Sequence, residues 1–559
     1  NLTTDFMTSV NQSSLTSSSI GKSNAGDITI NARNLVSLDG LSSITVNNPQ
    51  DQAAGNAGNV NIKAGLLNLT NGANISSGTS GTGNSGNITI NADNISLDGG
   101  TEQFLTSIST ETVSKNSGKG GNIELITGSI NITNGASLFS GTNGQGKSGN
   151  IIINASDTIK IDGTSKNFFV DNLGQNPIRF SSRIQSSTSL DGTGVSGDIS
   201  INAKNILLTN GGQIQASSVG QGDSGKIAIN SRDTVLIDGF GGESNRIITS
   251  SISSDGFKNQ AGSIELNTGI LTLTNGGKIS SSGIEGNGGN ININARDAIN
   301  IDGFVNIFRS SINNGLVRGV GKGGDIQLFT GSLSLTNGAT IVTSTAGQGN
   351  GGNITINARD SIKISSLNDN LSGIASDVRN NATGNAGNIS LTSNSLFLNN
   401  TAQVLSSTAD KGNAGNITLK VADISLANSS LIRGSVEPGG IGDAGDIDIQ
   451  GRTLSITSGS VIQSALFGSR GNLPAAQGRG GNIRINTSDY VTISGFGNTL
   501  FGTGLITGAD LGTSGNAGNI KIDTNQLKVR ETGTIAANTL SIGNGGDIAL
   551  FANTFELLN

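Results

Sequence analysis

The chain contains 559 residues, of which 85 are Gly and 4 are Pro, and it carries a formal net charge of -6. It has no Cys and no His, which excludes disulfides, thiolate nucleophiles, imidazole bases and the usual zinc sites. Its acidic balance, without a cluster of Lys and Arg, argues against a nucleic-acid partner. No run of about 20 apolar residues predicts insertion into a membrane.

The first residues, NLTTDFMTSVNQSS, have neither the basic start nor the apolar stretch of a signal peptide. We interpret residues 1–25 as the end of a preceding coil. Residues 26–559 are interpreted as one continuous repeat domain that stops inside its last coil. We therefore expect the chain to be a section of a longer protein.

A short motif recurs along the chain from residue 26 onward: a Gly, a small polar residue and an alternating apolar pair, as in GNITI. A period of roughly 20 to 50 residues is typical of a solenoid or another repeat array. We call the first residue of this motif the anchor Gly. The anchor positions are Gly26, Gly58, Gly86, Gly121, Gly149, Gly197, Gly225, Gly262, Gly289, Gly324, Gly352, Gly387, Gly415, Gly445, Gly481, Gly518 and Gly546.

Each repeat contains three short runs in which apolar and polar residues alternate. In residues 324–352 these runs carry Ile326 and Leu328, then Leu333 and Leu335, then Ile341 with Thr343. Alternation with a period of two predicts β-strands. Asn-Gly or Asp-Gly pairs between the second and third runs, such as 71–72 and 39–40, predict sharp corners.

A meander of β-hairpins is the competing interpretation of such pairs. A meander would not require every apolar position to recur in the next repeat. Every apolar position does recur in this sequence, and a fold in which equivalent strands stack on one another requires such recurrence. The sequence therefore predicts an all-β fold. It is a single-stranded, right-handed parallel β-helix of about 17 coils with three short strands per coil.

The residue after the anchor Gly is mostly Asn, and in five coils it is Asp. Stacked Asn side chains can form amide ladders from coil to coil, so we expect a structural ladder here. The five Asp residues never occupy adjacent coils, which keeps like charges apart. They are Asp27, Asp198, Asp325, Asp446 and Asp547.

Short and long coils alternate, and the extra residues follow the corner Gly. We expect these insertions to form a ridge of loops, several of which carry Phe. Exposed aromatic residues can bind sugars or anchor a protein partner, although the same Phe side chains could instead cover the aliphatic core. The longest coil, 149–197, contains the predicted binding residues Phe168, Phe169, Arg179 and Phe180.

The sequence gives little support for a metal, cofactor or catalytic site. The GNGGN and GNGGD segments are similar to calcium-binding nonapeptide repeats, but they occur once per coil rather than in tandem. Calcium binding at the turns stays an open alternative. We predict no catalytic residue, no metal site and no cofactor.

The phrases GNAGNITI, GNGGNITINARDSIKIS, LTLTNGG and LSLTNGATI resemble the repeats of the large filamentous-haemagglutinin-like exoproteins of cyanobacteria, which belong to the two-partner secretion family. The resemblance covers residues 26–559. It implies export through an outer-membrane barrel transporter and a secreted, extracellular or cell-surface location. It also implies an adhesin or an extracellular fibre, and the amino-terminal secretion domain of that family is not in this sequence.

Two classes of function follow. The first is a surface adhesin or structural stalk that binds a cell-surface glycan or protein through its loops, with lateral or end-to-end self-association left open. The alternative is a polysaccharide lyase or hydrolase, because many such enzymes are parallel β-helices. Asp162, Asp171 and Arg179 near the long insertion would be its candidates, but Asp162 sits at a recurring Asp-Gly corner. We therefore predict that the protein is not an enzyme.

Overall fold

The computed structural model describes residues 1–49, 54–100, 105–115, 118–165, 169–170, 177–190, 192–239, 249–367, 370–495 and 502–558. The chain divides into two compact units, Asn1–Ser281 (unit 1) and Ser282–Asn559 (unit 2). All regular structure in the described residues is β-strand, and parallel strands in stacked coils form a β-solenoid of about 17 turns. The predicted fold class is confirmed.

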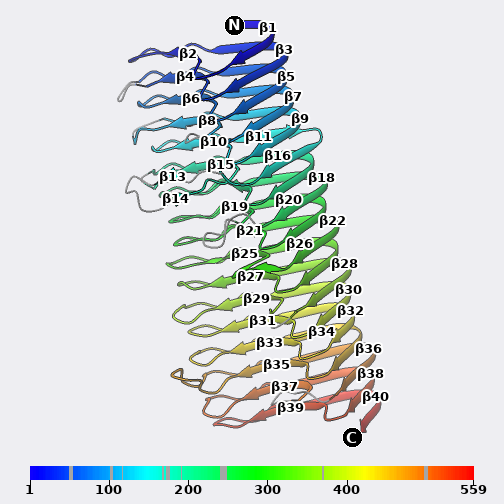
Figure 1. Ribbon diagram of the computed structural model, residues 1–559. Coiled ribbons are helices and arrows are strands. Elements are labelled where there is room, and N and C mark those ends of the chain that lie inside the picture. The colour runs from blue at the N-terminus through cyan, green and yellow to red at the C-terminus, as the bar shows by residue number, and fades with distance from the viewer. Residues whose placement is uncertain are drawn as a thin grey trace. The chain divides into compact units, whose positions relative to one another are not determined.

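Within each unit, nearly every coil contributes one long strand to a parallel sheet, the first sheet of that unit (Figure 1). In unit 1 these strands are β1 (Leu2–Ser9), β3 (Ile28–Asp39), β5 (Val60–Thr70), β7 (Ile88–Asp98), β9 (Ile123–Thr133), β11 (Ile151–Ala155), β12 (Thr158–Asp162), β16 (Ile199–Thr209), β18 (Ile227–Asp238) and β20 (Ile264–Thr274). In unit 2 they are β22 (Ile291–Asp302), β26 (Ile326–Thr336), β28 (Ile354–Ser365), β30 (Ile389–Asn399), β32 (Ile417–Leu426), β34 (Ile447–Thr457), β36 (Ile483–Ser494), β38 (Ile520–Arg530) and β40 (Ile548–Leu558).

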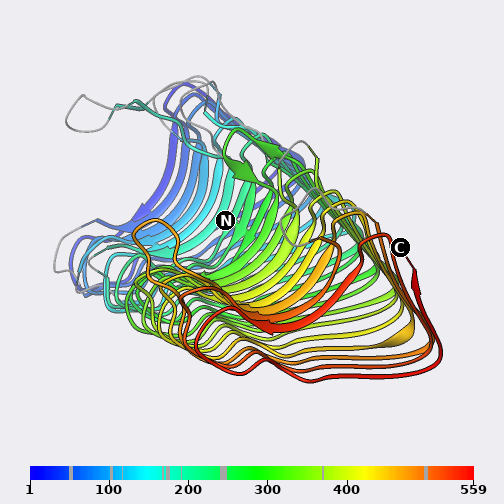
Figure 2. The same cartoon turned by 90° about the horizontal axis from the view of Figure 1, so that it is seen from below.

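Within each unit, a second parallel sheet contains the shorter strands, one from each coil that the structure describes except the last. Its strands in unit 1 are β2 (Ser14–Ser18), β4 (Ser43–Asn48), β6 (Asn74–Thr79), β8 (Ser107–Thr112), β10 (Ser137–Thr142), β15 (Arg183–Thr188), β17 (Gln213–Gln215), β19 (Ser251–Ser253) and β21 (Lys278–Ser280). In unit 2 they are β25 (Ser311–Leu316), β27 (Thr340–Thr345), β29 (Gly373–Val378), β31 (Gln403–Thr408), β33 (Leu431–Val436), β35 (Val461–Leu466), β37 (Gly504–Ala509) and β39 (Thr534–Thr539). Within each unit, the strands of successive coils follow the same path (Figure 2).

The long strand joins the first two strands that the sequence predicts. In β28, the pairing with β30 shifts register between Ala358 and Ser361, at the Arg-Asp pair of the NARD segment. The strand continues through this irregularity to Ser365, as strands do through β-bulges. Among the described residues, the two halves are separate strands only in the coil that starts at Gly149, as β11 and β12.

The core consists of aliphatic rows that run from coil to coil. Ile356 pairs in register with Leu328 of the preceding coil and Leu391 of the following coil, and all three side chains are fully buried. Thr355, its neighbour along β28, lies on the outward face and is partly exposed. Because successive side chains of a strand point to opposite faces, the alternation in the sequence correctly identifies the buried positions.

Corner residues link neighbouring coils through their side chains. Asp39 Oδ1 accepts hydrogen bonds from Thr70 Oγ1 at 2.5 Å and from Asn71 Nδ2 at 2.7 Å in the next coil. Asn71 has the positive φ of 53° that was expected at such a corner. The Asp-Gly corner of one coil therefore binds the Thr-Asn-Gly corner of the next, which explains why the two corner types alternate.

This contact predicts a local sensitivity to acid. Hydrogen bonds from Thr70 and Asn71 lower the pKa of Asp39 below its ordinary value of 3.8. A group with a lowered pKa in the folded state stabilises the fold above its ordinary pKa, and this contribution is lost as the pH falls through the folded value. We expect amide exchange at Thr70 and Asn71 to accelerate at a pH below 3.8.

Asp39→Asn is the matched control, because a neutral amide oxygen can accept the same two hydrogen bonds without titrating. In this variant the acid-dependent part of the exchange rate should be absent. Equal acid sensitivity of the variant and the wild type would contradict the assignment to Asp39.

Candidate functional site

The segment between each short strand and the next long strand has the pattern Gly-Asn-Ala-Gly-Asn in its most regular form. In unit 2 it occupies residues 349–353, 384–388, 412–416, 442–446, 478–482 and 515–519. Parallel pairing continues through it, since the Ala386 N–H donates to the Asn413 carbonyl at 2.9 Å and the Ala414 N–H donates to Asp443 at 2.9 Å. The segment therefore forms a flat wall of each coil, although it is not a regular strand.

The fourth residue of this segment is the anchor Gly, which packs directly on the anchor Gly of the preceding coil. A Cβ atom on Gly387 would lie 1.9 Å from the carbonyl oxygen of Gly352. Ser376 Oγ, which comes from β29, donates to this carbonyl at 3.1 Å and accepts from the Gly387 N–H at 2.8 Å. Close backbone approach and a buried hydroxyl group therefore fix the position of the wall.

Two rows of polar side chains follow these glycines along the stack. In both rows the side-chain oxygen accepts a hydrogen bond from the backbone N–H of the equivalent residue in the next coil. These bonds measure 2.8 to 3.0 Å, and their backbone donors are Asn385, Asn413, Asp443 and Arg479 in the first row and Asn388, Asn416 and Asp446 in the second. The first row contains Asn350, Asn385, Asn413 and Asp443. The second row contains Asn353, Asn388, Asn416 and Asp446.

These bonds determine how each Asn amide is oriented. Since Oδ1 of Asn385 and of Asn388 is bound to the next coil, the amide must present its Nδ2 group elsewhere. Among the described residues, no hydrogen-bond acceptor is found for Nδ2 of Asn385, Asn388, Asn413 or Asn416, and all four side chains are exposed. At these four positions the rows therefore display N–H donors, whereas Nδ2 of Asn353 donates to Asp325 Oδ1 at 3.2 Å.

Between the two rows lies a groove with a volume of about 640 Å³. Its floor consists of Gly and Ala, including the buried Ala386 and Ala414, and its sides are the two rows. We call this surface, residues 350–353, 385–388, 413–416, 443–446 and 479–482, the amide groove. Successive coils repeat its side chains about every 4.8 Å, the usual spacing of paired strands.

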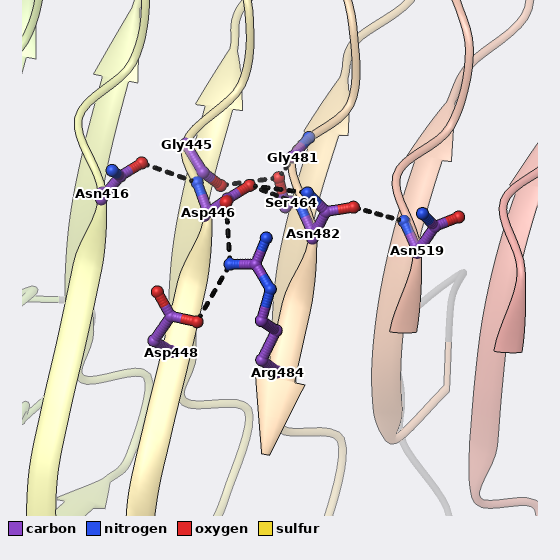
Figure 3. Close-up of polar contacts among 9 residues, drawn as sticks. All are labelled: Asn416, Gly445, Asp446, Asp448, Ser464, Gly481, Asn482, Arg484 and Asn519. Carbon is purple, nitrogen blue, oxygen red and sulfur yellow. Dashed lines mark hydrogen bonds and ion pairs between the residues drawn. The ribbon is translucent and has the colours of Figure 1, made fainter. Parts of the chain in front are cut away.

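One end of the amide groove is charged but internally compensated (Figure 3). Asp446 accepts from the Asn482 N–H at 2.7 Å and from Arg484 Nη1 at 2.9 Å, and Asp448 accepts from the same nitrogen at 3.1 Å. Partial burial lowers the pKa of Arg484, but the hydrogen bonds and charges of Asp448 and Asp446 outweigh it and leave the pKa above its ordinary value. Asp446 thus makes the same coil-to-coil bond as Asn while carrying a paired charge.

The predicted ladder exists, but its chemistry differs from the expectation. Side-chain amides at the position after the anchor Gly bind backbone N–H groups rather than mainly one another, because the wall leaves those N–H groups without a backbone acceptor. Amide-to-amide bonds occur elsewhere, for example from Asn202 to Asn154 at 2.8 Å and from Asn230 to Asn202 at 3.0 Å. The first row was not predicted. Its signal in the sequence was a second Gly-Asn pair, which comes three residues before the Gly-Asn pair that begins with the anchor Gly.

The predicted binding residues of the long coil lie in unit 1. Phe168 falls outside the described residues, and Phe169 belongs to β13 (Phe169–Val170), which pairs antiparallel with β14 (Pro177–Ile178). Arg179 and Phe180 are half-buried at the base of this hairpin. Phe180 exchanges two hydrogen bonds with Ser165, at 2.7 and 2.9 Å, and the Arg183 guanidinium lies 5.7 Å from the centre of its ring. Ligand binding by these residues stays a prediction.

Other Phe residues of the expected ridge are described only in unit 2. Phe304 and Phe308 belong to a second inserted hairpin, β23 (Phe304–Val305) and β24 (Phe308–Arg309), and both are exposed. Arg309 fixes this hairpin by donating to the carbonyls of Gly338 at 3.0 Å and Leu371 at 2.7 Å. Among the described residues, two insertions therefore contain short antiparallel strand pairs outside the parallel sheets, β13 with β14 and β23 with β24.

Within the described part of the chain, no three His, Cys, Asp or Glu side chains come together in a way that could hold a metal ion. The same residues include no helix of the length and hydropathy that crossing a membrane requires. No family model matches the chain, and no match was found among curated proteins or solved structures.

Proposed function

We propose that this protein is a surface adhesin or extracellular structural stalk that binds extended ligands along its stacked coils, and that it is not an enzyme. The observation that carries this proposal is the amide groove, in which neighbouring coils present the same exposed amide donors, at Asn385 and Asn388 and again at Asn413 and Asn416. A repeated track offers many equal contacts to a polymer or a surface. Catalysis instead requires one place where an acid, a base and the substrate converge.

The state of Asp162, which comes directly before the longest insertion, also supports a structural role for this carboxylate, whereas the other candidate, Asp171, lies outside the described residues. Burial raises its pKa, but hydrogen bonds from Thr209 and Asn210 and the charge of Lys160 outweigh this and lower the pKa overall. A catalytic general acid would need a raised pKa. Asp162 instead holds the Thr-Asn corner of the next coil, with Thr209 Oγ1 at 2.6 Å and Asn210 Nδ2 at 2.8 Å.

The location and partners of the protein are part of the same proposal. The resemblance of its repeats to filamentous-haemagglutinin-like exoproteins supports export by two-partner secretion through an outer-membrane barrel transporter. It also supports display at the cell surface or release outside the cell. The partner would then be a glycan or protein of a neighbouring surface.

A pair of assays tests this function. The purified chain should be retained by cell walls or insoluble polysaccharides in a sedimentation assay, and incubation with soluble neutral and acidic polysaccharides should release no reducing or unsaturated ends. Release of such ends would show an enzyme and overturn the proposal. Failure to sediment with any surface tested would contradict adhesion.

A further inference from the structure

We propose that the amide groove is a binding site for a neutral, linear polysaccharide that lies along the stack of coils. This inference rests on the proposed adhesive function and adds the location of the site and the chemistry of its ligand. Hydroxyl and ring oxygens of the sugar units would accept hydrogen bonds from the Nδ2 groups of Asn385, Asn388, Asn413 and Asn416.

The first argument is the excess of donors. Each Oδ1 of Asn385, Asn388, Asn413 and Asn416 already accepts one hydrogen bond from the next coil. Their Nδ2 groups have no acceptor among the described residues, so each amide offers the ligand two N–H donors and at most one remaining acceptor lone pair. An extended peptide presents its own N–H donors as often as carbonyl acceptors and would leave those donors unpaired. A polysaccharide presents oxygen acceptors on every unit, and its hydroxyl hydrogens can rotate toward water.

The second argument is the charge of the groove. Of the described residues that line it between 350 and 416, none carries a charged side chain. Arg479 enters only at the end where Asp443 and Asp446 also lie, and the whole chain has a net charge of -6. An anionic polymer would therefore lose its hydration without gaining cationic partners, so the ligand is assigned as neutral.

The third argument is the shape and repeat of the site. The floor of Gly and Ala lies between two parallel rows, and the amides recur about every 4.8 Å along the stack. This spacing is close to the length of one pyranose unit in an extended chain, so each coil can contact one sugar. Since the donors are held in place before binding, little conformational entropy is lost when the ligand is bound.

The chain itself supplies the test variant. Residues 442–446 read GDAGD where residues 384–388 read GNAGN, and Asp443 and Asp446 make the same coil-to-coil bonds at 3.0 and 2.7 Å. The double change Asn385→Asp with Asn388→Asp should therefore keep the fold, replace two donors by acceptors and add two charges. The matched control is Asn394→Asp with Asn400→Asp, two exposed positions outside the groove.

The binding experiment uses the full chain and a length series of neutral β-linked gluco-oligosaccharides, from dimer to octamer, measured by calorimetry at low and high salt. We expect affinity to rise with oligosaccharide length, to be independent of salt, and to fall about tenfold or more in the groove variant, a loss of about 1.4 kcal/mol. The control variant should bind like the wild type, and all three proteins should have the same melting temperature.

Three results would overturn this inference. They are unchanged binding by the groove variant, affinity that does not grow with length, and tighter, salt-sensitive binding of a matched oligogalacturonate series. With each of these three results the chain could still sediment with cell walls. The proposed adhesive function would then be retained, and the assignment of the amide groove as the polysaccharide site would be wrong. Released sugar products would instead overturn the proposed function.

Discussion

Replacing Ile356 by Asp is expected to unfold several coils of unit 2. The Ile356 side chain is fully buried between Leu328 and Leu391 of the neighbouring coils. A carboxylate at this position would have no partner in an aliphatic layer, and the cost is on the order of 5 kcal/mol. Because each coil is stabilised mainly by its two neighbours, the damage should extend beyond the substituted coil.

Circular dichroism melting and limited proteolysis would measure this effect, with cleavage expected around β28. Thr355→Asp provides the matched control, since Thr355 is the adjacent residue on the outward face of the same strand and is partly exposed. This variant should melt within a few degrees of the wild type. Similar losses in the two variants would contradict the assigned faces of β28.

Replacing the anchor Gly387 by Ala is expected to have the second largest effect, although the added group is a single methyl. The new Cβ atom would lie 1.9 Å from the Gly352 carbonyl oxygen, and backbone cannot move aside as a flexible side chain can. Separation of the two coils would also weaken the bonds of Ser376 to both glycines. We expect a loss on the order of 3 kcal/mol.

Urea unfolding would measure this loss, and Gly471→Asn is its control. Gly471 has no atom within 4 Å of the position of an added Cβ, and its φ of 60° is one that Asn tolerates. The control should unfold at nearly the same urea concentration as the wild type. A Gly387→Ala protein as stable as this control would show that the anchor glycines are not required by close packing.

Much of this architecture can be predicted from the sequence, because stacking places the same packing and hydrogen-bonding constraints on every coil. The alternation of Ile354, Thr355 and Ile356 predicts both the strand and its buried face, and the Asn-Gly and Asp-Gly pairs predict the corners. Periodicity could not predict that the first two strands join, because an irregularity at residues such as Arg359 and Asp360 has no fixed hydrophobic pattern. The joined strand had to be observed.

The amide groove was only partly predictable for a different reason. A recurring Asn indicates a ladder, but the sequence does not reveal which atom is its partner. That partner is the backbone N–H of the next coil, as at Asn416 and Asn388, where Oδ1 of Asn388 accepts at 2.8 Å. Only this geometry shows that the amide hydrogens face outward, and therefore that a structural ladder is also a surface of donors.

The bonds of the two rows all run in one direction: the acceptor oxygen belongs to the earlier coil and the donor N–H to the later one, as from Asn353 to Asn388 and from Asn388 to Asn416. A coil that has already folded therefore exposes unpaired acceptors on the side where the next segment of the chain arrives. At its other end the same folded stretch exposes unpaired N–H donors, so once a first group of coils has folded, further coils can add at either edge.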